Sequence, residues 1–114
     1  MRYMMIIHHD DAAMAKTDQK ALWADYAAFN EALGKAAGAS SGERLEPPNG
    51  ATIVRGSDIL DGPYSDSKEQ LAGYFFVDVP NVEEAVAWAQ RCPSSRFGSI
   101  EIRPLFVPKG DWKQ

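Results

Sequence analysis

The sequence predicts an α+β fold in which two helices cover one face of an antiparallel sheet. Three observations indicate this fold: two strand-like runs that are apolar on both faces, two amphipathic helical stripes, and an order of elements that begins and ends with a strand. The chain has 114 residues, of which 45% are hydrophobic and 25% charged. We therefore expect a single globular domain over residues 1–114.

The first half of the chain predicts a buried strand followed by a long helix. Residues 3–8 combine Tyr, Met and Ile without polar alternation, which indicates a strand covered on both faces. Residues 9–16 begin with polar side chains, and we expect a loop there. A helix is predicted over residues 18–37, with Gly38 as its C-terminal cap. Its apolar stripe consists of Leu22, Tyr26, Phe29 and Leu33.

The middle of the chain carries two turn signals. Pro47-Pro48-Asn49-Gly50 separates residues 43–46 from residues 51–55, and we expect these flanks to pair as a β-hairpin. A tight turn is predicted at Asp61-Gly62-Pro63-Tyr64, because proline fixes its own backbone and restricts that of its neighbour.

The second half predicts a central strand, a shorter helix and a last strand. Residues 73–79 (GYFFVDV) are apolar on both faces, and Asn81 with Glu84 fits a capping box at the start of a helix that Pro93 ends. Residues 99–103 alternate apolar and charged side chains, as a half-exposed strand does. The complete order matches the split pattern of ferredoxin-like folds.

The strands that are apolar on both faces predict a homodimer. Helices cover one face of such a sheet, so Tyr74, Phe76 and alternate residues of the first strand would form an exposed apolar patch. The same sheet of a second copy would cover this patch and enclose a cavity for a small-molecule ligand. The alternative is that residues 38–50, or the tail with Phe106 and Trp112, cover the face within one chain.

Composition and charge exclude several classes of protein. The net charge is −4 and no segment concentrates Lys and Arg, so we expect no nucleic-acid partner. The apolar run at residues 4–7 is too short to span a membrane and is followed by no signal-peptide cleavage site. Cys92 is the single cysteine and can form neither an internal disulfide nor a CxxC zinc site. We expect a cytoplasmic protein without a membrane partner, metal or cofactor.

Two residues are predicted as catalytic. His8 lies in a cluster of histidine and carboxylate residues, the usual setting for acid/base chemistry, whereas the structural alternative is a solvated strand end. If His8 faces the cavity, His9 must face the helices or solvent, because consecutive strand residues point to opposite sides. Asp61 offers a carboxylate at the cavity mouth or, alternatively, an acceptor for its own turn. The predicted ligand-binding residues are Tyr64, Lys68 and Trp23.

The turn at residues 61–64, followed by Lys68-Glu69-Gln70-Leu71 and the strand GYFFVDV, resembles the YCII-related family in its DGPF-motif branch. Residues 93–104 are similar to that branch as well. The resemblance implies a dimeric α+β barrel, and members of this branch mostly have no assigned activity. Tyr64 stands where the motif usually has Phe.

The resemblance also bears on catalysis. The acid/base pair suggested for the other branch of the family, a His on the first helix and an Asp before a Pro, falls near Tyr26 and at Cys92 in this chain. The resemblance therefore implies that this pair is absent. The sequence favours a small-molecule-binding or enzymatic role in a dimer cavity, with a non-catalytic interaction or regulatory module as the alternative.

Overall fold

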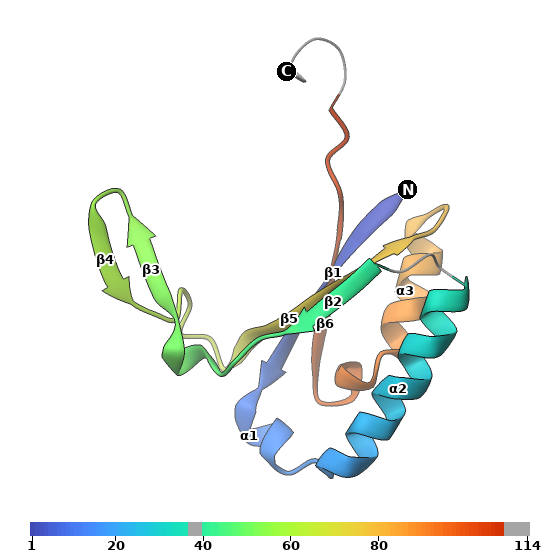
Figure 1. The fold of residues 1–114 in the computed structure, drawn as a ribbon, viewed down its shortest axis with the longest axis horizontal. Coiled ribbons are helices and arrows are strands. Elements are labelled where there is room, and N and C mark those ends of the chain that lie inside the picture. The colour runs from blue at the N-terminus through green and yellow to red at the C-terminus, as the bar shows by residue number, and fades with distance from the viewer. Residues whose placement is uncertain (37–39, 109–114) are drawn as a thin grey trace.

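A four-stranded antiparallel sheet is the centre of the fold (Figure 1). The computed structural model describes residues 1–36 and 40–108. The strands follow one another in space as β2 (Ser40–Arg44), β5 (Glu69–Asp78), β1 (Arg2–Asp10) and β6 (Gly98–Pro104). This order is the ferredoxin-like one, and the two strands predicted to be apolar on both faces, β1 and β5, are the central pair.

Two helices lie on the same face of this sheet, as the sequence predicts (Figure 1). They are α2 (Gln19–Ala36) and α3 (Val82–Arg91). The Asp18 carboxylate accepts the backbone N–H groups of Lys20 and Ala21 at the start of α2, and Asn81 caps α3 through the N–H of Glu84. The C-terminal cap predicted at Gly38 lies outside the described residues.

The hydrophobic core lies between the sheet and these helices. Tyr3, Met5, Ile7 and His9 alternate along β1 as its buried residues. Phe29 of α2 packs edge-to-face on Phe75 of β5, with ring centroids 5.8 Å apart. Side chains of this size each contribute about 1.5–3 kcal/mol to stability when fully buried. The alternation along β1 therefore fixes which face of the sheet receives the helices.

None of the helices formed by the described residues lies on the opposite face of the sheet (Figure 1). Its central rows pair Met4 with Phe76 and Ile6 with Tyr74, and all four side chains are half-buried. His8 continues this face of β1. We refer to this surface, formed by Met4, Ile6, His8, Tyr74 and Phe76, as the open face.

The hairpin predicted between residues 43–46 and 51–55 is wrong, because other residues form its strands. Residues 40–44 form β2 and pair with β5, and the hairpin is made instead by β3 (Thr52–Arg55) and β4 (Asp58–Asp61). The turn lies at Gly56, whose φ of 63° glycine adopts without a steric penalty. The Pro-Pro-Asn-Gly signal forms the short 3-10 helix η1 (Pro48–Gly50). Pairing with the central strand β5 thus outweighs the local turn signal.

Two shorter elements complete the fold. Residues 11–15, predicted as loop, form the helix α1 (Asp11–Ala15), because the Asp10 carboxylate accepts the N–H of Ala12 at 3.0 Å and caps it. A second 3-10 helix, η2 (Pro93–Arg96), follows α3 directly. It leads the chain from α3 into β6.

Candidate functional site

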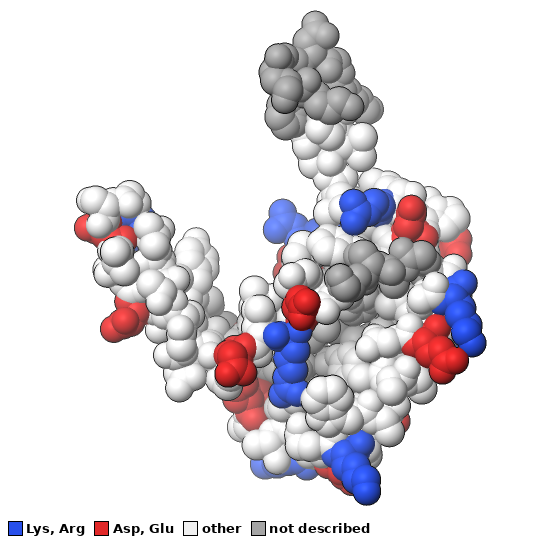
Figure 2. Space-filling view, viewed as in Figure 1, with Lys and Arg blue, Asp and Glu red and all other residues white. Residues whose placement is uncertain are grey.

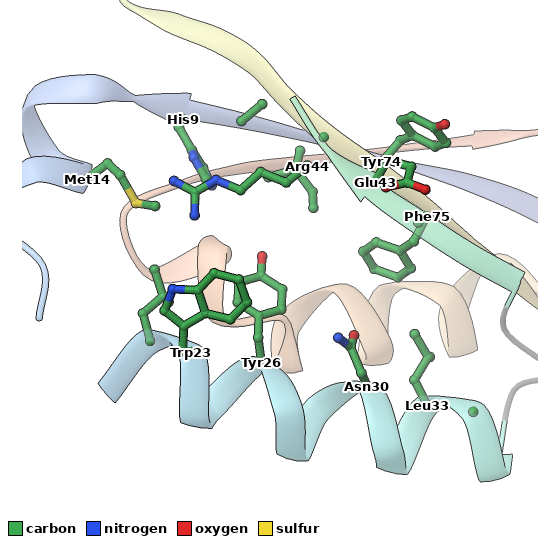
Figure 3. A pocket seen from close by; sticks show the side chains of 16 residues that line it. His9, Met14, Trp23, Tyr26, Asn30, Leu33, Glu43, Arg44, Tyr74 and Phe75 are labelled. Carbon is green, nitrogen blue, oxygen red and sulfur yellow. The ribbon is translucent and has the colours of Figure 1, made fainter. Parts of the chain in front are cut away.

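A pocket of about 540 Å³ opens between α2 and the strands β2 and β5, on the helix-covered side of the sheet. Figure 2 shows the surface hollowed between the sheet and α2, with mostly uncharged walls. The apolar wall consists of Ile7, Met14, Leu22, Leu33 and Phe75. The polar groups that reach the pocket are His9, Tyr26, Asn30 and Arg44 (Figure 3). Apolar walls with a few converging polar groups are typical of small-molecule sites.

His9 projects from β1 towards the helices and is 8% exposed. Its Nε2 atom lies 2.8 Å from the Ser94 hydroxyl oxygen, and its ring packs against Phe97 at 5.1 Å between centroids. Burial lowers the pKa of His9 below 6.5, and the positive charge of Arg44 lowers it further, against opposing effects of nearby carboxylates. His9 is therefore neutral at pH 7 and can accept a proton at one ring nitrogen.

Ser94 connects His9 to the first long helix. Its fully buried hydroxyl is hydrogen-bonded to His9 and to the Tyr26 hydroxyl, which also lies 3.4 Å from the Cys92 sulfur. Burial raises the pKa values of Tyr26 and Cys92, so both groups stay protonated at neutral pH. The four side chains form one neutral hydrogen-bonded chain, which we call the polar chain. It can hold or relay a proton at the pocket wall.

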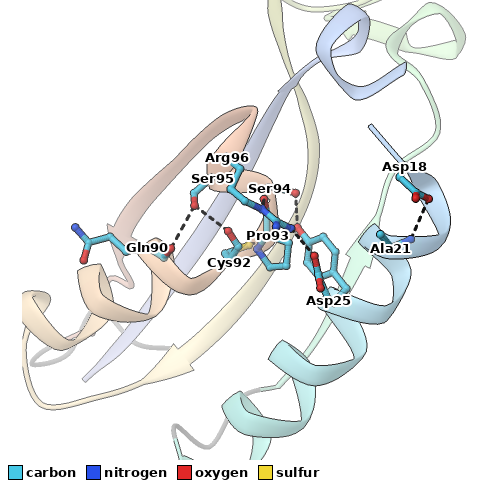
Figure 4. A network of polar contacts seen from close by, with 10 residues as sticks. Asp18, Ala21, Asp25, Gln90, Cys92, Pro93, Ser94, Ser95 and Arg96 are labelled. Carbon is cyan, nitrogen blue, oxygen red and sulfur yellow. Dashed lines mark hydrogen bonds and ion pairs between the residues drawn. The ribbon is translucent and has the colours of Figure 1, made fainter. Parts of the chain in front are cut away.

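The element η2 places Ser94 at this point. Arg96 of η2 forms an ion pair with Asp25 of α2 at 2.9 Å, and Ser95 donates its hydroxyl hydrogen to the Cys92 carbonyl (Figure 4). Pro93 occupies the first position of η2, where its missing N–H costs no hydrogen bond. These contacts anchor the turn against α2 behind the pocket.

Arg44 extends from β2 across the pocket towards His9 (Figure 3). It forms no ion pair with any carboxylate in residues 1–36 and 40–108. The neighbouring Glu43 pairs in register with Tyr74, and both side chains point away from the pocket in Figure 3. Among the described residues the guanidinium therefore has no ion-pair partner, although the carboxylates of Asp11 and Glu69 act on the neighbouring His9 with the opposite sign.

The structure does not unite the two residues predicted as catalytic. His8 lies on the open face, with its Nε2 atom 3.1 Å from a carboxylate oxygen of Glu101. Asp61 pairs with Thr52 in the separate two-stranded sheet and is exposed. The prediction that His8 and His9 point to opposite sides is confirmed, and it is His9 that reaches the pocket.

One of the three residues predicted to bind a ligand lies at the pocket. Trp23 lines its mouth and is 69% exposed. Tyr64 is 83% exposed beside the hairpin, and Lys68 forms an ion pair with Asp10 at 3.4 Å. Tyr64 and Lys68 are absent from the lining of this pocket.

The sequence contained part of the signal for the residues that it missed. The family resemblance singled out the positions of Tyr26 and Cys92, and the structure brings these side chains together. The strand alternation also turned His9 towards the helices. Ser94 carried no signal of its own, and Arg44 was missed because its segment was assigned to the wrong hairpin.

Comparison with known proteins is consistent with this fold. The YCII-related domain matches residues 1–113. The chain belongs to the YCII-related domain family. An uncharacterized protein of Rhizobium meliloti (strain 1021) is 28% identical to this YCII-related domain over 118 residues, which cover 96% of the chain and 95% of the relative. Within residues 1–36 and 40–108 of this YCII-related domain, no helix has the length and apolarity needed to cross a membrane.

Proposed function

We propose that this YCII-related domain is a cytoplasmic homodimer that binds a small organic molecule in the pocket between α2 and the sheet. The observation that carries the proposal is the pocket itself. Its volume of about 540 Å³ lies within the roughly 300–1,000 Å³ of small-molecule sites. The apolar wall can bury the body of such a molecule, and Arg44 with the polar chain can orient it. Within the family, we expect the domain to belong to the DGPF-motif branch, with Tyr64 in place of the usual Phe.

The open face is the surface that we propose for this dimer. Its half-buried Met4, Ile6, Tyr74 and Phe76 would complete their burial against the same residues of a second copy. In that assembly His8 would face the partner's sheet, as part of the cavity predicted from the sequence. Any role of His8, Asp61, Tyr64 or Lys68 in ligand binding depends on that assembly.

One observation favours a second candidate function, that of a protein-interaction module. The β3–β4 hairpin projects from the body of the domain (Figure 1). Val54 and Ile59 on this hairpin are 69% and 74% exposed. Exposed apolar residues gathered on one element often contact another protein.

The two consecutive histidines provide a matched test of where a ligand binds. His9→Gln alters the pocket between α2 and the sheet, whereas His8→Gln alters the open face. A screen of small metabolites by thermal shift should find compounds that raise the midpoint of the parent protein. We expect His9→Gln to remove that stabilisation and His8→Gln to retain it. The reverse result would transfer the binding site to the open face and defeat the proposed location.

The dimer is tested by sedimentation velocity of the full chain and of two variants. Phe76→Asp introduces a charge on the open face, and we expect it to produce monomers. Val54→Asp introduces the same charge on the hairpin and should leave the dimer intact. A parent protein that sediments as a monomer at every concentration would refute the dimer, and splitting by Val54→Asp alone would favour the interaction module.

A further inference from the structure

We infer that the molecule bound in this pocket is a small carboxylate with an apolar or aromatic body, and that Arg44 binds its carboxylate group. This inference rests on the proposed function, because it specifies the class of molecule that the same pocket takes. It depends on the charge of the pocket, the position of Arg44 and the distribution of apolar side chains.

The charge of the pocket favours an anion. Among the described residues, the lining contains one basic residue, Arg44, and one acidic residue, Glu43, whose carboxylate points away from the pocket (Figure 3). The remaining polar groups at the wall, His9, Tyr26 and Asn30, are uncharged at neutral pH, since burial lowers the pKa of His9 and raises that of Tyr26. A ligand anion would therefore meet a guanidinium that forms no ion pair among the described residues, while Asp11 and Glu69, the carboxylates that act on His9, are not part of the pocket lining.

The position of Arg44 is fixed by the pairing of β2 with β5. Arg44 lies opposite Gly73 in the ladder, and directly opposed residues send their side chains to the same face of a sheet. A Cβ atom at Gly73 would lie 2.6 Å from the Glu43 carbonyl oxygen, so the close approach of the two strands requires glycine there. With no side chain at Gly73, Arg44 has space to extend over the pocket.

The division of the lining into apolar and polar parts favours a carboxylate over a phosphate. Leu22, Leu33 and Phe75 offer apolar surface for a ring or a short chain. A guanidinium can bind a planar carboxylate through two parallel hydrogen bonds. Phosphate groups are usually held by several basic or backbone donors, whereas this lining has a single basic side chain.

The test uses matched pairs of compounds and variants. Nitrogen-15 NMR spectra of the full chain would be titrated with aromatic and aliphatic carboxylates, such as benzoate and phenylacetate, and with their uncharged amides. Arg44→Gln removes the charge at the pocket, and Arg55→Gln on the hairpin is the control. Arg44→Lys keeps the positive charge but cannot form the two parallel hydrogen bonds of a guanidinium to a carboxylate.

We expect carboxylates to bind the parent at least about tenfold more tightly than their amides and to shift amide signals of pocket residues. Arg44→Gln should abolish this preference, Arg44→Lys should restore part of it, and Arg55→Gln should leave it unchanged. Equal binding of acids and amides by the parent, or tighter binding of phenyl phosphate, would overturn the carboxylate inference and leave the binding pocket standing. If neither series shifts pocket signals at millimolar concentration, the proposed function fails together with the inference.

Discussion

Replacing Ser94 by alanine tests how much the polar chain contributes to the stability of the domain. The hydroxyl is fully buried and is hydrogen-bonded to His9 and Tyr26, so its removal leaves two polar groups without that partner. An unsatisfied buried group costs about 1–3 kcal/mol. Tyr26 retains the weaker contact with Cys92 at 3.4 Å. We therefore expect Ser94→Ala to lower the free energy of unfolding by about 2–4 kcal/mol.

For a chain of this length, that loss corresponds to a fall of about 8–16 °C in the midpoint of thermal unfolding. Urea unfolding followed by circular dichroism measures it directly. Ser99→Ala is the matched control, because the Ser99 hydroxyl donates to Glu69 at the exposed surface, and its loss should cost less than about 0.5 kcal/mol. Equal effects of the two substitutions would show that the buried chain contributes nothing particular to stability.

Three further predictions follow from burial and close packing. The pKa of His9 is lowered in the folded state, so the unfolded chain binds more protons at pH values below 6.5. The free energy of unfolding should therefore fall as the pH decreases below 6.5. In unfolding experiments, His9→Gln should flatten this pH dependence. Gly62→Ala should weaken the base of the hairpin, because a Cβ atom there would lie 2.6 Å from that of Ala51; unchanged hydrogen exchange of the hairpin amides would contradict this. Phe29→Ala should cost about 3–5 kcal/mol by calorimetry, because its buried ring packs on Phe75, and a loss below 1 kcal/mol would count against this core.

The sheet and its helices could be predicted because their signals are local and repeated. Residues 3–7 and 74–77 are apolar on both faces, and the stripe of α2 extends over three turns. The two runs identify central strands, and the stripe identifies both a helix and its buried side. The antiparallel pairing of the two central strands then follows from the order of elements.

The hairpin and the pocket could not be predicted because they depend on competition between distant segments. A turn signal at Pro47-Pro48-Asn49-Gly50 is satisfied equally by η1, and only the availability of β5 decides that residues 40–44 pair elsewhere. That pairing carries Arg44 to the pocket. Ser94 reaches His9 because η2 packs on α2 through the ion pair of Arg96, a contact 71 positions apart in the chain.

The adjacent histidines of β1 make the domain sensitive to the register of this strand. A slip of β1 by one residue against its neighbours would exchange the sides of the two imidazoles without altering the composition of the strand. Met4 and Ile6 would then turn inward, and Tyr3, Met5 and Ile7 would turn outward. The loss of core packing on that slip ties the two histidines to their opposite surroundings.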